Sequence, residues 1–216
     1  MTLSSAVALG GLALLLVGLL AYERGGAGSR EIALVATLAA AAAAGRVLFV
    51  AIPSAQPVTA LTIVTGVALG PRAGAAVGAT AALVSNAFLG QGPWTPWQML
   101  TWGLCGAMAG CLAPVLRHPA ALVAYGCAWG FLFGAIMNTW QLAAFGPALN
   151  LPAFITTEVR GLPFDVAHAV TNVVLLGLAG PALIRLLDRY ARRLSVDIDW
   201  EPGAAAASTA ASSSGP

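Results

Sequence analysis

The side chains with the most chemical potential in this sequence are a few polar residues set inside long apolar segments. Arg46 stands alone in one such segment. Two further groups have helical spacing: Asp165, His168 and Asn172 at i, i+3 and i+7, and Gln98, Thr101, Trp102 and Cys105 at i, i+3, i+4 and i+7. Each spacing places its side chains on one face of a helix. Polar groups in hydrocarbon face a bundle interior or a watery cavity, so these faces predict an internal binding site.

The composition explains why these residues must be internal. Of 216 residues, 59% are hydrophobic and 8% are charged, whereas soluble domains carry about a quarter charged residues. The mean hydropathy is +0.85, so a polytopic membrane protein is expected. The chain has no lysine, which excludes a P-loop and a lysine Schiff base. It also has no basic cluster of the kind that grips nucleic acid.

The apolar segments predict an all-α membrane bundle of seven spans. A spanning helix needs about 20 apolar residues. The expected helices cover residues 3–22, 31–52, 57–71, 73–89, 98–116, 119–145 and 163–193, the last kinked by Pro181. The short third helix leaves a re-entrant hairpin with the fourth as an alternative. That arrangement would place Arg72 in the middle of the bilayer, at a cost of at least about 2.5–3.5 kcal/mol, so seven spans are preferred.

Three regions follow from these spans. Residues 1–30 form an extra N-terminal transmembrane helix and a cytoplasmic loop, residues 31–193 a six-helix core, and residues 194–216 a disordered cytoplasmic tail rich in Ala, Ser and Gly. Arginines in alternate loops fix the orientation. One side receives Arg24, Arg30, Arg72, Arg117, Arg185, Arg189, Arg192 and Arg193, and the other only Arg160. The protein is therefore expected in the plasma membrane with its N-terminus outside and its C-terminus cytoplasmic.

With this topology the intramembrane polar residues fall in the outer halves of the helices and describe a cup open to the exterior. The loop 90–97 lies at its rim. Simpler explanations remain open: the tryptophans as an interfacial belt, single amides and hydroxyls as bridges between helices, and Arg46 with Asp165 as a structural ion pair. Asp165 and His168 supply only two metal ligands, so neither a metal site nor a cofactor is predicted.

Two other functions are alternative hypotheses for the same residues. An intramembrane hydrolase would need a pair such as Ser85 and His168, but the chain lacks G-x-S-x-G, H-E-x-x-H and a paired-carboxylate cluster. A stand-alone secondary transporter would show inverted repeats with broken helices, and no internal repeat is visible.

Small residues form a second pattern. Alanines occupy positions 36, 39–44 and their neighbours, and glycines and alanines recur four apart in 74–82. Such spacing lets helix backbones approach closely. Packing within the chain is one explanation, and a docking face for a membrane partner is the other.

Several motifs together resemble a known family. They are Gly45-Arg46, Ile52-Pro53, Gln56-Pro57-Val58-Thr59-Ala60-Leu61, Gly70-Pro71-Arg72-Ala73-Gly74, Ser85-Asn86, Gly90-Gln91-Gly92-Pro93-Trp94-Thr95-Pro96-Trp97-Gln98-Met99 and Pro163-Phe164-Asp165 with His168 and Asn172. Over residues 31–193 the chain resembles the substrate-specific (S) component of energy-coupling factor (ECF) vitamin transporters.

The resemblance implies a non-enzymatic subunit that captures a vitamin from outside, a corrinoid such as cobalamin being suggested. It implies docking on a transmembrane T subunit, through Ala36, Ala40 and Ala44, and ATP hydrolysis by two cytoplasmic ATPase subunits. The expected substrate-binding residues are Arg46, Thr59, Asn86, Gln91, Trp94, Trp97, Gln98, Trp102, Asn138, Gln141, Asp165, His168 and Asn172.

Overall fold

The computed structural model describes residues 13, 28–146 and 150–194, and within them it is a bundle of α-helices without strands. The elements are α2 (Ser29–Leu48), α3 (Val58–Leu69), α4 (Pro71–Leu89), α5 (Thr95–Cys111), α6 (Ala113–Leu116), α7 (Pro119–Phe145), α8 (Leu151–Leu178) and α9 (Gly180–Leu194). The predicted all-helical bundle is confirmed. Most of the extra N-terminal helix and the C-terminal tail lie outside the described residues.

Proline sets where many of these helices begin. It stands in the first turn of α4, α5, α6, α7 and α8, where its missing N–H costs no helical hydrogen bond. Gly70, which precedes α4, has a φ of 93°, a left-handed conformation that favours glycine. α3 and α4 are therefore two separate helices joined by a tight turn.

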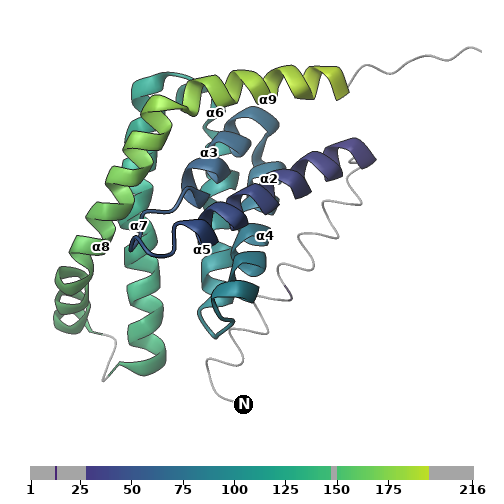
Figure 1. Cartoon of the computed structure of the whole chain (residues 1–216). Helices are drawn as coiled ribbons and strands as arrows, with labels where there is room; N and C mark the ends of the chain where they lie inside the picture. The colour runs from purple at the N-terminus through teal and green to yellow at the C-terminus, as the bar shows by residue number, and fades with distance from the viewer. Residues whose placement is uncertain (1–12, 14–27, 147–149, 195–216) are drawn as a thin grey trace, which may run out of the picture.

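The last two helices, α8 and α9, differ from the single helix predicted over 163–193. The helix expected to start at Pro163 starts at Leu151, because Pro152 occupies its first turn, and Pro163 lies inside it. Asp165 therefore lies near the middle of the 28-residue α8, not in its outer part. At the other end α8 stops at Leu178, and α9 leaves in a new direction across the end of the bundle (Figure 1). The expected kink at Pro181 is thus a break between two helices.

The fifth helix also differs from its predicted range of 98–116. It begins at Thr95, three residues before the expected start, and ends at Cys111, after which α6 forms a separate short turn. α7 matches its predicted range of 119–145. Among the described helices α2, α7 and α8 are long and apolar enough to cross a membrane, and α3 is a shorter apolar helix.

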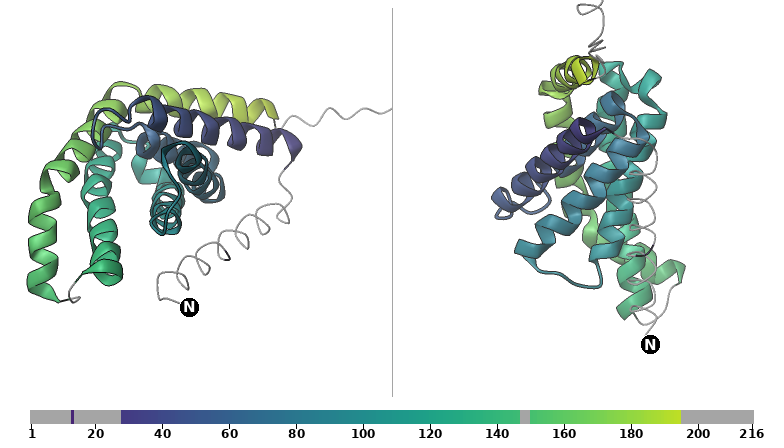
Figure 2. Two further views of the ribbon diagram at one scale, coloured as in Figure 1. Left: turned by 60° about the horizontal axis from the view of Figure 1, so that its bottom comes forward. Right: turned by 90° about the vertical axis from the view of Figure 1, so that its right-hand side faces the viewer.

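The bundle is joined at one end and separates toward the other. We call the end with α9 the inner end and the end with the 90–94 loop the outer end (Figure 1). Figure 2 shows the α7–α8 hairpin standing apart from α4 and α5 toward the outer end. At the inner end one apolar core unites α3, α7, α8 and α9, with Ile63, Leu122, Leu176, Ile184 and Leu187 buried in it.

Glycines allow the closest helix contacts. On α5, a Cβ at Gly106 would overlap the backbone of Gly74 on α4. On α7, Gly126, Gly130 and Gly134 are four residues apart and face α8. A Cβ at Gly130 would overlap the backbone of Ala169, whereas at Gly126 and Gly134 it would overlap the side chains of Leu176 and Asp165. Small residues at this spacing pack membrane helices through backbone contact, so much of the predicted small-residue pattern is used inside the chain.

We expect Gly106→Ala to destabilise the bundle, because the added methyl group has no space between α4 and α5. Overpacking of this kind costs about 1–3 kcal/mol, and each kcal/mol lowers the melting temperature of a chain this size by about 2–4 °C. Thermal unfolding in detergent measures the change. Gly103→Ala is the matched control, since its Cβ would meet no heavy atom closer than 3.6 Å. Equal melting temperatures for the two variants would contradict this packing.

Candidate substrate-binding site

Arg46, at the C-terminal end of α2, is the centre of a buried polar cluster. Only 8% of the residue is exposed. Its Nη1 donates to Ser85 Oγ at 2.7 Å and to Asn86 Oδ1 at 2.6 Å on α4. Its Nε donates to Gln56 Oε1 at 3.0 Å, and its Nη2 to Gln98 Oε1 at 3.3 Å. A single side chain therefore ties together α2, α4, α5 and the segment before α3.

All four of these acceptors are neutral. The ion pair between Arg46 and Asp165 that the sequence left open does not form. Asp188, another carboxylate in the described part of the chain, forms a salt bridge with Arg117. A guanidinium has five N–H donors, and the four bonds above leave one on Nη2 uncommitted. The guanidinium also lies 4.9 Å from the centre of the Trp102 ring, a stabilising cation–π contact. The cluster thus holds a positive charge, and one N–H on Nη2 of Arg46 can donate to a further acceptor.

The cluster continues to the rim loop. Asn86 Nδ2 donates to Gln98 Oε1 at 2.8 Å and to Thr95 Oγ1 at 2.9 Å. Thr95 in turn donates to Gln91 Oε1 at 2.9 Å, and Gln91 Nε2 donates to the Leu83 carbonyl. These bonds fix the 90–97 loop on the ends of α4 and α5, so the loop and the charged centre form one unit.

A second polar contact connects this unit to α8. Trp102 Nε1 donates to Thr59 Oγ1 at 2.8 Å, and the same hydroxyl lies 2.8 Å from His168 Nε2. Thr59 and Trp102 are 0% and 3% exposed. Since these bonds join positions in α3, α5 and α8, they hold the α7–α8 hairpin against the rest of the bundle.

Aromatic rings form a continuous row beside these bonds. The Trp102 and Phe133 ring centroids are 4.6 Å apart, and Phe133 meets His168 edge-on at 5.2 Å. The row runs from the guanidinium of Arg46 to α8. It places buried aromatic rings next to a charged donor, a combination of groups that suits a ligand that is both aromatic and polar.

The structure brings seven of the predicted binding residues into this connected group and places the other six elsewhere. The seven are Arg46, Thr59, Asn86, Gln91, Gln98, Trp102 and His168. For all thirteen residues a binding role stays a prediction, and the six outside the group are described next.

Four of them lie in or beside the α7–α8 hairpin. Asn138 Nδ2 donates to Glu158 Oε1 at 3.0 Å, and Asn172 Nδ2 to the Gly126 carbonyl at 2.9 Å. Asp165 lies directly against Gly134, and Gln141 is exposed. The contacts of Asn138, Asp165 and Asn172 join α7 to α8.

The remaining two are tryptophans of the rim. Trp94 is half-buried, with its ring against Gly92. Trp97 is also half-buried, and its buried Nε1 has no hydrogen-bond partner. Both lie beside Thr95, which is 5% exposed, so they border the polar cluster without being bonded into it.

Four residues of the site are absent from the predicted binding residues: Gln56, Ser85, Thr95 and Phe133. Glu158, the partner of Asn138 outside this group, was not predicted either. Thr95 stands between Trp94 and Pro96 at the start of α5, and its place in the rim motif was the available signal. Glu158 was assigned to a loop because α8 was expected to start later. Phe133 gives no signal in the sequence, since an aromatic residue in an apolar span is ordinary.

Ser85 and His168, the pair of the hydrolase alternative, have separate hydrogen-bond partners. Ser85 Oγ accepts from Arg46 and donates to the Ala82 carbonyl at 3.2 Å, whereas His168 contacts Thr59. The serine and the imidazole of the hydrolase alternative are thus committed to different partners. Within the described residues no group of three or more His, Cys, Asp and Glu could hold a metal ion.

We expect Thr59→Val to weaken the attachment of the α7–α8 hairpin, because it leaves Trp102 Nε1 and His168 Nε2 without their shared partner. An unsatisfied buried polar group costs about 1–3 kcal/mol, measurable as a lower melting temperature in detergent. Thr62→Val is the matched control: Thr62 is also 0% exposed, but its Oγ1 has no hydrogen-bond partner to lose. If the two valine variants have the same melting temperature, the hydrogen bonds of Thr59 do not contribute to stability.

Comparison with known proteins agrees with the helical bundle and its internal polar site. The sequence matches the family described as ECF-type riboflavin transporter, S component, over residues 27–189. That range contains the Arg46 cluster, the aromatic row and α8. Neither the curated proteins nor the solved structures give a match. The match does not support the corrinoid subgroup. On the strength of the match over most of its length, the chain belongs to the family of ECF-type riboflavin transporter S components.

Proposed function

We propose that this S component binds a flat, heteroaromatic vitamin from outside the cell, with riboflavin as the first candidate. The observation that carries the proposal is the buried Arg46 guanidinium, held by neutral acceptors over the Trp102 ring. A flavin ring is flat and carries carbonyl oxygens and ring nitrogens that accept hydrogen bonds. It would meet the aromatic row with its face and the guanidinium with its acceptor edge.

The outward-facing rim supports capture from the exterior. The 90–97 loop closes on the polar cluster at the outer end, whereas the inner end is filled by the apolar core. We therefore infer that a ligand enters at the outer end under the 90–97 loop and that its release at the inner end is a separate step. Release toward the cytoplasm requires a partner that moves the loaded bundle, because this chain has no nucleotide-binding motif.

The proposed partner surface is the exposed side of α2. Ala36, Ala40 and Ala44 are exposed, whereas Ala39 and Ala42 on the other side are buried against the bundle. Alanines four residues apart let a second helix approach closely. We assign this face to the transmembrane T subunit, which would connect the chain to two cytoplasmic ATPase subunits.

Arg46→Ala is expected to abolish retention of riboflavin while leaving membrane insertion unchanged. Loss of hydrogen bonds to a charged group costs about 1.5–3 kcal/mol, or about 10- to 150-fold in affinity. Mass spectrometry of small molecules retained by the purified protein identifies the ligand, and flavin fluorescence quenching measures its Kd. Arg160→Gln, at an exposed position on α8, is the charge-matched control. Undiminished riboflavin binding by the Arg46 variant would contradict the assignment, and retention of cobalamin would favour the corrinoid reading.

Ala36→Leu with Ala40→Leu should remove the T subunit from the purified complex without reducing ligand retention, because the larger side chains keep the two helices apart. Co-purification from membranes that contain all four subunits measures the effect. Ala124→Leu, at an exposed alanine of α7, controls for added bulk on a spanning helix. A wild-type chain that brings down no partner and yet transports its ligand would instead be a stand-alone secondary transporter.

A further inference from the structure

α9 is an amphipathic helix whose apolar side is already occupied. Ile184 and Leu187 are 4% and 7% exposed and belong to the inner core, and Leu183 packs against the same core. The helix lies across the inner end of the bundle instead of continuing the direction of α8 (Figure 1). Its opposite side faces away from the core and is exposed.

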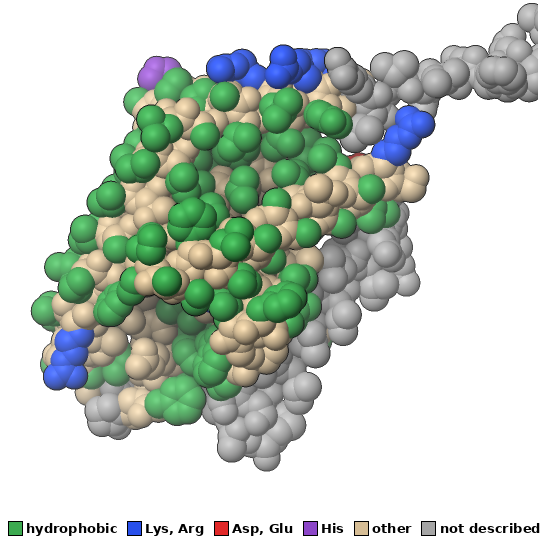
Figure 3. All heavy atoms as spheres, in the orientation of Figure 1, with side chains coloured by type: hydrophobic (Ala, Val, Ile, Leu, Met, Phe, Trp, Pro, Cys, Tyr) green, Lys and Arg blue, Asp and Glu red, His purple; other side chains and the backbone are tan. Residues whose placement is uncertain are grey.

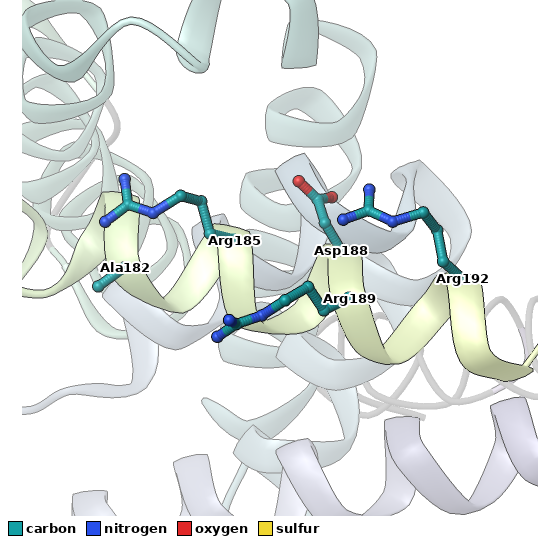
Figure 4. Close-up of a pocket in the computed structure, with 5 residues that line it drawn as sticks. All are labelled: Ala182, Arg185, Asp188, Arg189 and Arg192. Atoms are coloured by element: carbon teal, nitrogen blue, oxygen red, sulfur yellow. The ribbon is translucent and has the colours of Figure 1, made fainter.

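That opposite side carries a row of arginines. Arg185, Arg189 and Arg192 are exposed and spaced at i, i+4 and i+7, which places them on one face. With Ala182 and Asp188 they line a pocket along the helix (Figure 4). Figure 3 shows basic side chains gathered over α9 on a face that is otherwise largely apolar.

The acidic residue in this pocket is matched by a cation from another element. Asp188 accepts from Arg117 Nη1 at 2.7 Å and from Nη2 at 3.0 Å. These hydrogen bonds hold the pKa of Asp188 below its ordinary value, so it is charged at neutral pH. The positive charge of Arg192 also acts on Asp188. One negative charge is thus set against Arg117 and the three arginines of the row, so the net charge of this surface stays positive.

Apolar side chains flank the row. Leu186 and Tyr190 are 41% and 52% exposed, are spaced at i and i+4, and lie between the arginines and the buried side of α9. A basic helix with exposed leucine and tyrosine beside its arginines is typical of the membrane interface, where the apolar groups enter the acyl boundary and the cations stay at the level of the phosphates. An acidic protein surface would account for the arginines but not for this flank.

We propose that the arginine row of α9 binds the phosphate groups of anionic phospholipids in the cytoplasmic leaflet. The bidentate donor geometry of arginine matches phosphate. The leaflet that receives most of the arginine-rich loops is the cytoplasmic one, and it carries the anionic lipids. Bound lipids would hold α9 at the interface and so fix the depth of the inner end.

The test is native mass spectrometry of the purified full chain with phosphatidylglycerol or phosphatidylcholine of identical acyl chains. We expect preferential retention of phosphatidylglycerol. Removing one basic residue near a membrane surface weakens binding about fivefold, so Arg185→Gln with Arg189→Gln should weaken it about 25-fold. The lysine pair Arg185→Lys with Arg189→Lys should keep most of the preference. Arg160→Gln, a single change of the same type at an exposed position outside α9, should change nothing.

Three results would overturn the proposal. The first is equal retention of the two lipids by the wild-type chain, and the second is unchanged phosphatidylglycerol binding by the glutamine pair. The third is binding of soluble glycerol phosphate as tightly as the lipid, which would indicate a free-phosphate site. If the glutamine pair keeps the lipid but loses the partner subunits in a salt-dependent way, the row meets an acidic protein instead. The melting temperature of each variant in detergent reports whether the bundle is intact.

Discussion

The guanidinium of Arg46 brings a full positive charge into the interior of the bundle, where water no longer solvates it. Burying a charge costs several kcal/mol unless hydrogen bonds replace the lost hydration. The chain supplies that replacement from Gln56, Ser85, Asn86 and Gln98. These four residues come from three segments, namely the stretch before α3, α4 and α5, so the arrangement of α2, α4 and α5 at the outer end follows from satisfying one side chain.

The inner end is held by a different force. There the helices meet through apolar side chains and through glycine contacts in which backbones touch. Such contacts have no hydrogen-bonding capacity to offer a ligand. At the outer end the interactions are hydrogen bonds between neutral amides, hydroxyls and one cation, which a polar ligand can exchange one for one. The division explains how one small bundle can be firmly closed on one side and receptive on the other.

Sequence reasoning reached the fold because its main signals are local. Pro119 and a continuous apolar run predicted α7. Arg46 could be predicted as an internal polar residue, since an arginine in an apolar span needs internal partners. The start of α8 was misplaced because Pro152 and Pro163 both resemble helix boundaries, and which of them begins the helix depends on tertiary packing. The contact between Thr59 and His168 joins positions 109 residues apart. No local pattern predicts it, and the same holds for the role of Phe133.

The absence of an ion pair between Arg46 and Asp165 bears directly on binding. Had the two paired, a ligand would have had to separate buried opposite charges, and breaking such a pair costs about 3–5 kcal/mol. Arg46 is satisfied instead by neutral acceptors, and a typical intramolecular hydrogen bond contributes only about 0.5–1.5 kcal/mol, rising to about 1.5–3 when one partner is charged. A ligand carbonyl can take the place of one such acceptor while the others remain. The ligand exchange proposed for Arg46 would therefore leave most of its hydrogen bonds in place.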